Sequence, residues 1–209
     1  MRNFLRDKGL DIFLGLNLLI LLLILTGLLL LGRAPSFYRD FSKVSQSELG
    51  LRTERLLQDL LEATNLVRQG QEFQLEIQED DLNSLLAAGP LPEDFLPHSL
   101  ENLQVHFLPP SGRGEEWGEV ILAGMTTNFH LDAVISAHCR LNKRDQGFSL
   151  RVEKLRVGAL PIPQRFFKSI ISHIQDTRLE NIFQEVEIKK IRVEEGWLRI
   201  VGRGRPDSE

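Results

Sequence analysis

Five histidines are the side chains of this sequence best suited to acid–base or metal chemistry: His98, His106, His130, His138 and His173. His130 and His138 fall on one face of an expected strand, but eight strand residues separate them by about 26 Å, too far to share a metal ion. The chain also lacks HExxH, paired CxxC, GxSxG and a glycine-rich phosphate loop. We therefore predict no catalytic residue, no metal site and no cofactor, and expect that the protein is not an enzyme.

Two further reactive features have structural interpretations. Asp80 and Asp81 are adjacent at the start of an expected helix, where carboxylates suit the positive end of the helix dipole and are usually solvated. The single cysteine, Cys139, lies in a row of alternating apolar residues, which predicts a buried small side chain. Neither feature indicates catalysis.

The N-terminal region is strongly apolar. Residues 12–31 carry no charge, and sixteen of these twenty residues are Leu, Ile or Phe. As a helix the segment would be about 30 Å long, the thickness of a bilayer core, which predicts a transmembrane helix. A cleaved signal peptide is disfavoured because the apolar stretch is long and Pro35 follows the small residue Ala34.

This interpretation makes the protein a single-pass signal anchor whose membrane partner is the lipid bilayer. We expect residues 1–11 to form a cytoplasmic leader and the C-terminal domain to be extracytoplasmic, although basic residues on the two sides of the span are nearly balanced. Residues 35–209 carry 21 basic and 27 acidic residues, a net charge of −6. That charge excludes the usual basic kind of nucleic-acid binder.

Residues 32–70 read as a juxtamembrane linker followed by an amphipathic helix. Ser45 and Glu48 have the spacing of a capping box, and Gly70 is placed to end the helix. Internal packing on the domain, a stalk and a coiled-coil contact all remain open for this helix. In a partner-binding role, residues 46–69 would present an apolar stripe that includes Leu49, Leu56 and Leu60 to another envelope protein or a second copy.

The remaining chain, residues 71–201, predicts an α+β domain, with a polar tail at 202–209. Alternating apolar residues predict strands around residues 73–77, 103–107 and 120–122, and a short helix is expected at 79–89. The odd positions from Phe129 to Leu141 are all apolar, which is typical of a long strand in an antiparallel sheet with one wet face. Glu194, Glu195 and Gly196 predict a turn into a last strand that begins at Trp197.

Two changes of apolar phase indicate that the sheet bends. The buried positions switch parity near Glu153-Lys154 and again near Lys189-Lys190, and each switch requires a bulge or twist. Phe166, Phe167, Ile170, Ile171 and Ile174 have helical spacing after a proline-rich turn. We therefore predict a transmembrane helix followed by a long, curved antiparallel sheet wrapped around an amphipathic helix.

The order of these segments resembles the YpmS-like family of bacterial membrane-anchored proteins. The resemblance is carried by the apolar N-terminus, the helix start Asp81-Leu82-Asn83, the long alternating strand, and the turn from Gly158 through Leu160-Pro161-Ile162-Pro163. It implies architectural roles for Asn83, Gly158, Pro161 and Pro163. The layout is also similar to tubular lipid-binding domains of the bactericidal-permeability-increasing kind, which implies a lipid-handling role.

We accordingly expect a membrane-anchored extracytoplasmic protein that binds or hands over a lipid or another apolar ligand. An acyl chain would lie between the sheet and the aromatic helix, gaining about 0.8 kcal/mol per buried methylene. The candidate lining residues are Leu131, Ala133, Ile135, Phe166, Phe167 and Ile170. The alternative is a non-enzymatic scaffold or partner-binding module whose core is solid.

Overall fold

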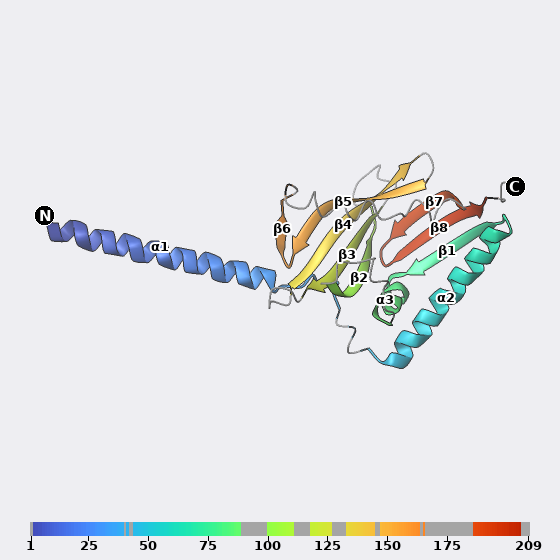
Figure 1. Cartoon of the computed structure of the whole chain (residues 1–209), viewed down its shortest axis with the longest axis horizontal. Helices are drawn as coiled ribbons and strands as arrows, with labels where there is room; N and C mark the ends of the chain where they lie inside the picture. Colours follow the sequence, from blue (N-terminus) through green and yellow to red (C-terminus); the bar gives the residue numbers. More distant parts are fainter. Residues whose placement is uncertain are drawn as a thin grey trace.

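The computed structural model describes residues 2–39, 41, 44–88, 100–110, 118–126, 133–144, 147–163, 165 and 186–205, with the backbone alone for 2–15, 142–144 and 147–150. The described chain is α+β and combines three helices with two antiparallel sheets. The helices are α1 (Arg2–Leu31), α2 (Gln46–Arg68) and α3 (Glu79–Ala88). Figure 1 shows α1 projecting from the body, with its C-terminal end near β6 (Leu160–Ile162).

The smaller sheet has the order β1-β8-β7. Its strands are β1 (Glu72–Gln78), β7 (Val186–Glu194) and β8 (Trp197–Gly204). The expected turn at Glu195-Gly196 joins β7 and β8. The register shifts between Ile188 and Lys190, so Lys189 is the extra residue of a bulge. This confirms the bulge that the change of apolar phase predicted at Lys189-Lys190.

The larger sheet has the order β2-β3-β4-β5-β6. Its other strands are β2 (Leu100–Leu108), β3 (Glu119–Thr126), β4 (Ala133–Arg144) and β5 (Gly147–Val157). His138 pairs with Lys154 whereas Cys139 pairs with Val152, which leaves Glu153 as the bulged residue. The second predicted bulge is therefore confirmed as well.

The two sheets meet over one apolar cluster. Its buried members are Val105, Phe107 and Val120 from the larger sheet and Val193 from β7. Leu82 and Leu86 of α3 pack against them. Each fully buried side chain of this kind contributes about 1.5–3 kcal/mol relative to exposure. The cluster thus joins both sheets and α3 into one unit.

Helix α2 packs on the smaller sheet, which selects one of the arrangements left open by the sequence. Ala63 is buried against Phe73 and Leu75 of β1, and Leu60 packs on the same cluster. The predicted helix start is confirmed, since Ser45 Oγ accepts from Glu48 N at 3.3 Å. The Glu48 carboxylate accepts from Arg52 Nη2 at 2.8 Å rather than completing the capping box.

This packing corrects the residues expected to face a partner. Leu56 is only 1% exposed and therefore lies inside the protein. The exposed leucines of α2 are instead Leu51, Leu57 and Leu61.

The predicted single sheet wrapped around a helix is wrong for the described part of the chain, because the strands divide between two sheets. The proposed central helix, with Phe166, Phe167 and Ile170, lies outside the described residues, as does Leu131. The prediction that one face of β4 is exposed to solvent is also wrong, since Val134 and Ser136 on that face are 5% and 1% exposed. Both faces of this part of β4 are covered.

The predicted membrane topology requires a correction too. Across the described residues, no helix meets the length and apolarity that a membrane crossing needs. This finding contradicts the predicted transmembrane helix at 12–31 and the single-pass, signal-anchor localisation based on it.

Candidate functional site

The candidate site is a pocket of about 640 Å³ between residues 33–37 and one face of the larger sheet. It begins where α1 ends and is lined from all four long strands of that sheet. Its lining residues are Arg33, Ala34, Pro35, Ser36, Phe37, His106, Leu108, Ile121, Ser136, His138, Arg156, Gly158 and Ala159.

Strand register brings the two histidines of the pocket together. His106 on β2 pairs with Ile121 on β3, and Ile121 pairs with His138 on β4. Directly paired residues share one face of a sheet, so these three side chains form a row across the pocket floor. Ser136 and Arg156 pair in the same way between β4 and β5.

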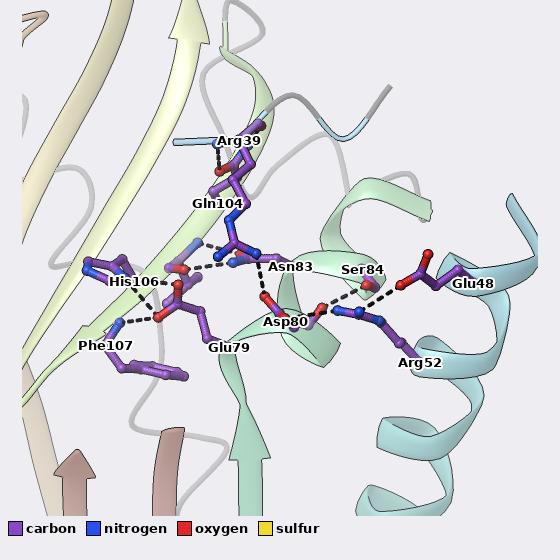
Figure 2. Close-up of polar contacts among 11 residues, drawn as sticks. Arg39, Glu48, Arg52, Glu79, Asp80, Asn83, Ser84, Gln104, His106 and Phe107 are labelled. Carbon is purple, nitrogen blue, oxygen red and sulfur yellow. Dashed lines mark hydrogen bonds and ion pairs between the residues drawn. The ribbon is translucent and has the colours of Figure 1, made fainter. Parts of the chain in front are cut away.

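The pocket is covered by residues 33–39, which we call the strap. Phe37 stacks on the His106 ring, with centroids 4.6 Å apart and planes at 7°. Tyr38 Oη donates to Asn102 O at 3.0 Å. The buried Gln104 side chain binds both backbone groups of Arg39: its Oε1 accepts from Arg39 N at 2.9 Å and its Nε2 donates to Arg39 O. Gln104 therefore holds the strap as a neighbouring strand would (Figure 2).

The other end of the strap is held through the turn between β5 and β6. Ala159 N donates to Leu30 O at 2.8 Å, and Gly158 N donates to Val134 O at 2.7 Å. Gly158 has φ +57°, and a Cβ at this position would lie 2.2 Å from Leu31 O. Because no side chain fits there, glycine lets the end of α1 rest directly on this turn.

The acidic start of α3 anchors the strap and the histidine row. Both carboxylate oxygens of Glu79 lie 2.9 Å from His106 Nδ1, and Glu79 Oε2 also accepts from Phe107 N at 2.9 Å. Asp80 forms ion pairs with Arg39 of the strap and Arg52 of α2, at 3.2 and 3.0 Å (Figure 2). The expectation that Asp80 and Asp81 are simply solvated caps is wrong: Asp80 links separate segments, and Asp81 is only 6% exposed.

His138 lies farther from its partner carboxylate than His106 does. Its Nδ1 lies 3.6 Å from Glu119 Oε2. Burial lowers the pKa of His138, and the positive charges of Arg156 and Lys154 lower it further, while Glu119 acts in the opposite direction. The imidazole is therefore neutral at pH 7, able to donate through one nitrogen and accept through the other.

Cys139 contributes no reactive group to this pocket. Cys139 is 1% exposed, as predicted, and burial raises the pKa of its thiol to about 12. It lies on the opposite face of β4 from His138. Within the described ranges, no group of three or more His, Cys, Asp and Glu side chains is arranged to hold a metal ion.

Two of the residues expected to line a ligand site, Ala133 and Ile135, do not line this pocket. Ala133 and Ile135 have the opposite parity on β4 from Ser136 and His138, so they face away from this pocket. Of the turn residues, Gly158 lines the pocket, Pro161 lies in β6 opposite Arg156, and Pro163 follows β6. Asn83 binds the backbone of β2 instead of contributing to the pocket.

The sequence alone did not identify His106, His138 and Arg156 as members of one site. Each has the polar parity of an alternating strand, which was the available signal. Bringing them together, however, depends on cross-strand register, and that is set by packing between distant segments.

Comparison of the chain with protein-family models, curated proteins and solved structures finds no match. The YpmS-like resemblance therefore stays a prediction.

Proposed function

We propose that this protein binds an amphipathic ligand, lipid-like in character, in the pocket beneath the strap. The observation that carries the proposal is the pocket itself. Its volume of about 640 Å³ lies within the range of about 300–1,000 Å³ that small-molecule sites occupy.

The pocket lining suits a ligand with two chemically different ends. Pro35, Phe37, Leu108 and Ile121 provide apolar wall, where a hydrocarbon chain would gain about 0.8 kcal/mol per methylene removed from water. The arginines, histidines and serines offer hydrogen-bonding groups to a polar end. The lining of this pocket differs from the residues predicted between β4 and the aromatic segment, and the proposed ligand class is the same.

The strap provides a route for entry and release. It is held to the sheet mainly by the Gln104 contacts, the Tyr38 hydrogen bond and the Phe37 stack, so it could separate from β2 without disturbing the apolar cluster between the sheets. Ligand loops of low local stability commonly move in this way.

The partner-binding alternative has less support. Leu56 is buried and Leu60 packs against the cluster at β1, so two of the three leucines expected to meet a partner already pack inside the domain. We therefore favour ligand binding.

The test is binding of a fluorescent twelve-carbon amphiphile to the full-length chain, with A159W as the blocked variant. Ala159 lines the pocket and is exposed, so an indole there should obstruct the site without entering the core. A87W, on the exposed end of α3 and outside the pocket, is the control. We expect saturable binding that A159W weakens at least tenfold and A87W leaves unchanged. Absence of saturable binding, or equal binding by A159W, would overturn the proposal.

A further inference from the structure

The ionisable groups that line the pocket are all basic. Among the described residues, Arg33, His106, His138 and Arg156 contribute to the wall, and no Asp or Glu lines it. The whole chain has the opposite balance, with 29 acidic against 25 basic residues. The basic character of the pocket is therefore local and is not expected from the overall composition of the chain.

We infer that the ligand's head group is anionic, a carboxylate or a phosphate, and that the guanidinium groups of Arg33 and Arg156 bind it beside His138. This inference rests on the proposed function and assigns the chemistry of the ligand's polar end. Guanidinium groups match the planar oxygen pairs of carboxylates and phosphates, which they bind through two parallel hydrogen bonds.

The two arginines are available for this role. Within the part of the chain that the structure describes, neither forms an ion pair with a carboxylate, whereas Arg39, Arg52 and Arg199 all do. Arg33 is contributed by the strap and Arg156 by β5, so an anion bound by both would also join the strap to the sheet. Head-group binding and strap closure would therefore stabilise each other.

Two carboxylates contact the histidines of the pocket without lining it. Glu79 contacts His106 Nδ1 and Glu119 faces His138 Nδ1, so both carboxylates orient a ring without lining the cavity. Ser36 and Ser136 add hydroxyl groups that can donate to an anion.

The positive charges of Arg156 and Lys154 act on the pocket floor, because both disfavour protonation of His138. Burial is the largest cause of the lowered pKa of this ring, and Glu119 acts against the two cations. The negative end of the α1 dipole lies nearby, but its carbonyl groups at Leu28 and Leu30 already accept from Gly32, Arg33 and Ala159 amides.

The test compares ligands that share a twelve-carbon chain and differ in head group. Dodecyl phosphate and dodecanoate are anionic, dodecylphosphocholine is zwitterionic and dodecyl maltoside is uncharged. Each is titrated into the full-length chain below its micelle concentration, and inorganic phosphate and acetate are titrated separately. We expect the anionic amphiphiles to bind at least tenfold more tightly than dodecyl maltoside, and inorganic phosphate and acetate to bind far more weakly.

Arginine variants identify the groups responsible. R33Q and R156Q should each weaken dodecyl phosphate binding about tenfold and leave dodecyl maltoside unchanged, because the charge-assisted hydrogen bonds are lost and the apolar wall is kept. R151Q is the matched control: Arg151 is exposed on β5 but does not line the pocket.

The outcomes separate this inference from the function on which it rests. If dodecyl maltoside binds as tightly as dodecyl phosphate, or if R33Q and R156Q bind dodecyl phosphate as wild type does, anionic recognition is wrong and amphiphile binding stands. If inorganic phosphate equals dodecyl phosphate, the anion site stands and the amphiphile proposal fails. If nothing binds, both fail.

Discussion

The side-chain amide of Asn83 binds both backbone polar groups of Val105, 22 residues further along the chain. Asn83 Nδ2 donates to Val105 O at 2.9 Å, and Asn83 Oδ1 accepts from Val105 N at 2.7 Å. Glu79 accepts from Phe107 N, and Phe107 O accepts from Gly196 N at 3.3 Å. The outer edge of β2 is therefore satisfied by α3 and by the β7–β8 turn instead of by another strand, which protects it from edge pairing.

Replacing Asn83 should destabilise the protein strongly. N83A leaves Val105 N and Val105 O buried without partners, and each such group costs about 1–3 kcal/mol. We expect the free energy of unfolding, measured by urea denaturation, to fall by about 2–5 kcal/mol. N65A, at an exposed position of α2, should change it by less than about 0.5 kcal/mol. A loss of less than 1 kcal/mol for N83A would contradict this role.

Two glycines should respond oppositely to alanine. G158A forces a Cβ against Leu31 O at a residue with φ +57°, so we expect a loss of more than about 1 kcal/mol and faster hydrogen exchange at the Ala159 amide. Gly50 is exposed in α2 and has no atom within 4 Å of an added Cβ. G50A should raise stability by about 0.5–1 kcal/mol. Equal effects of the two substitutions would count against the contact between α1 and the turn.

Gln104 should control the opening of the strap. Q104E replaces the group that donates to Arg39 O with an acceptor and places negative charge in a buried position, so the strap should detach more often. We expect hydrogen exchange at the Arg39 amide to accelerate at least tenfold. Gln74, exposed on β1, provides the matched control Q74E, which should leave Arg39 exchange unchanged. Unaltered Arg39 exchange in Q104E would show that other contacts hold the strap.

His138 should make stability depend on pH. Its pKa is lowered in the folded protein by burial and by Arg156 and Lys154, against the effect of Glu119. Because the unfolded chain then binds more protons, the His138 contribution is complete above the ordinary value of 6.5 and is lost as the pH falls below it. The slope from this residue cannot exceed about 1.36 kcal/mol per pH unit.

The measurement is urea denaturation at pH 7.5 and 5.5 for the wild-type chain and H138Q. The wild-type chain should lose more stability between the two values than the variant does. If the free energy of unfolding of H138Q falls as much as that of the wild-type chain or more, the prediction is wrong.

Cys139 should be inert toward thiol reagents in the folded state. Its thiol is buried and its pKa is raised to about 12, so almost no thiolate forms near neutral pH. We expect labelling by a chromogenic disulfide to be limited by unfolding and to become rapid in denaturing urea. Rapid labelling without denaturant would indicate that β4 opens.

Local patterns were sufficient to predict many elements. The starts of α2 and α3, the β7–β8 turn, the burial of Cys139 and the bulges at Glu153 and Lys189 each depend on residues a few positions apart, so periodicity and capping determine them. The division into two sheets was not accessible in this way. Val193 joins Val105 and Phe107 across almost ninety residues of chain, and nothing local specifies that pairing.

The sequence by itself therefore determined where the chain forms helices, strands, turns and bulges, because those choices follow from neighbouring side chains. Tertiary structure alone decided which strands pair, which face of β4 the strap covers and which charged groups meet. Arg33, His106, His138 and Arg156 come from four separate segments, and only the register of the larger sheet and the path of the strap bring them to one pocket. A functional site assembled from such distant residues is a property of packing, whose free energy is spread over the whole domain.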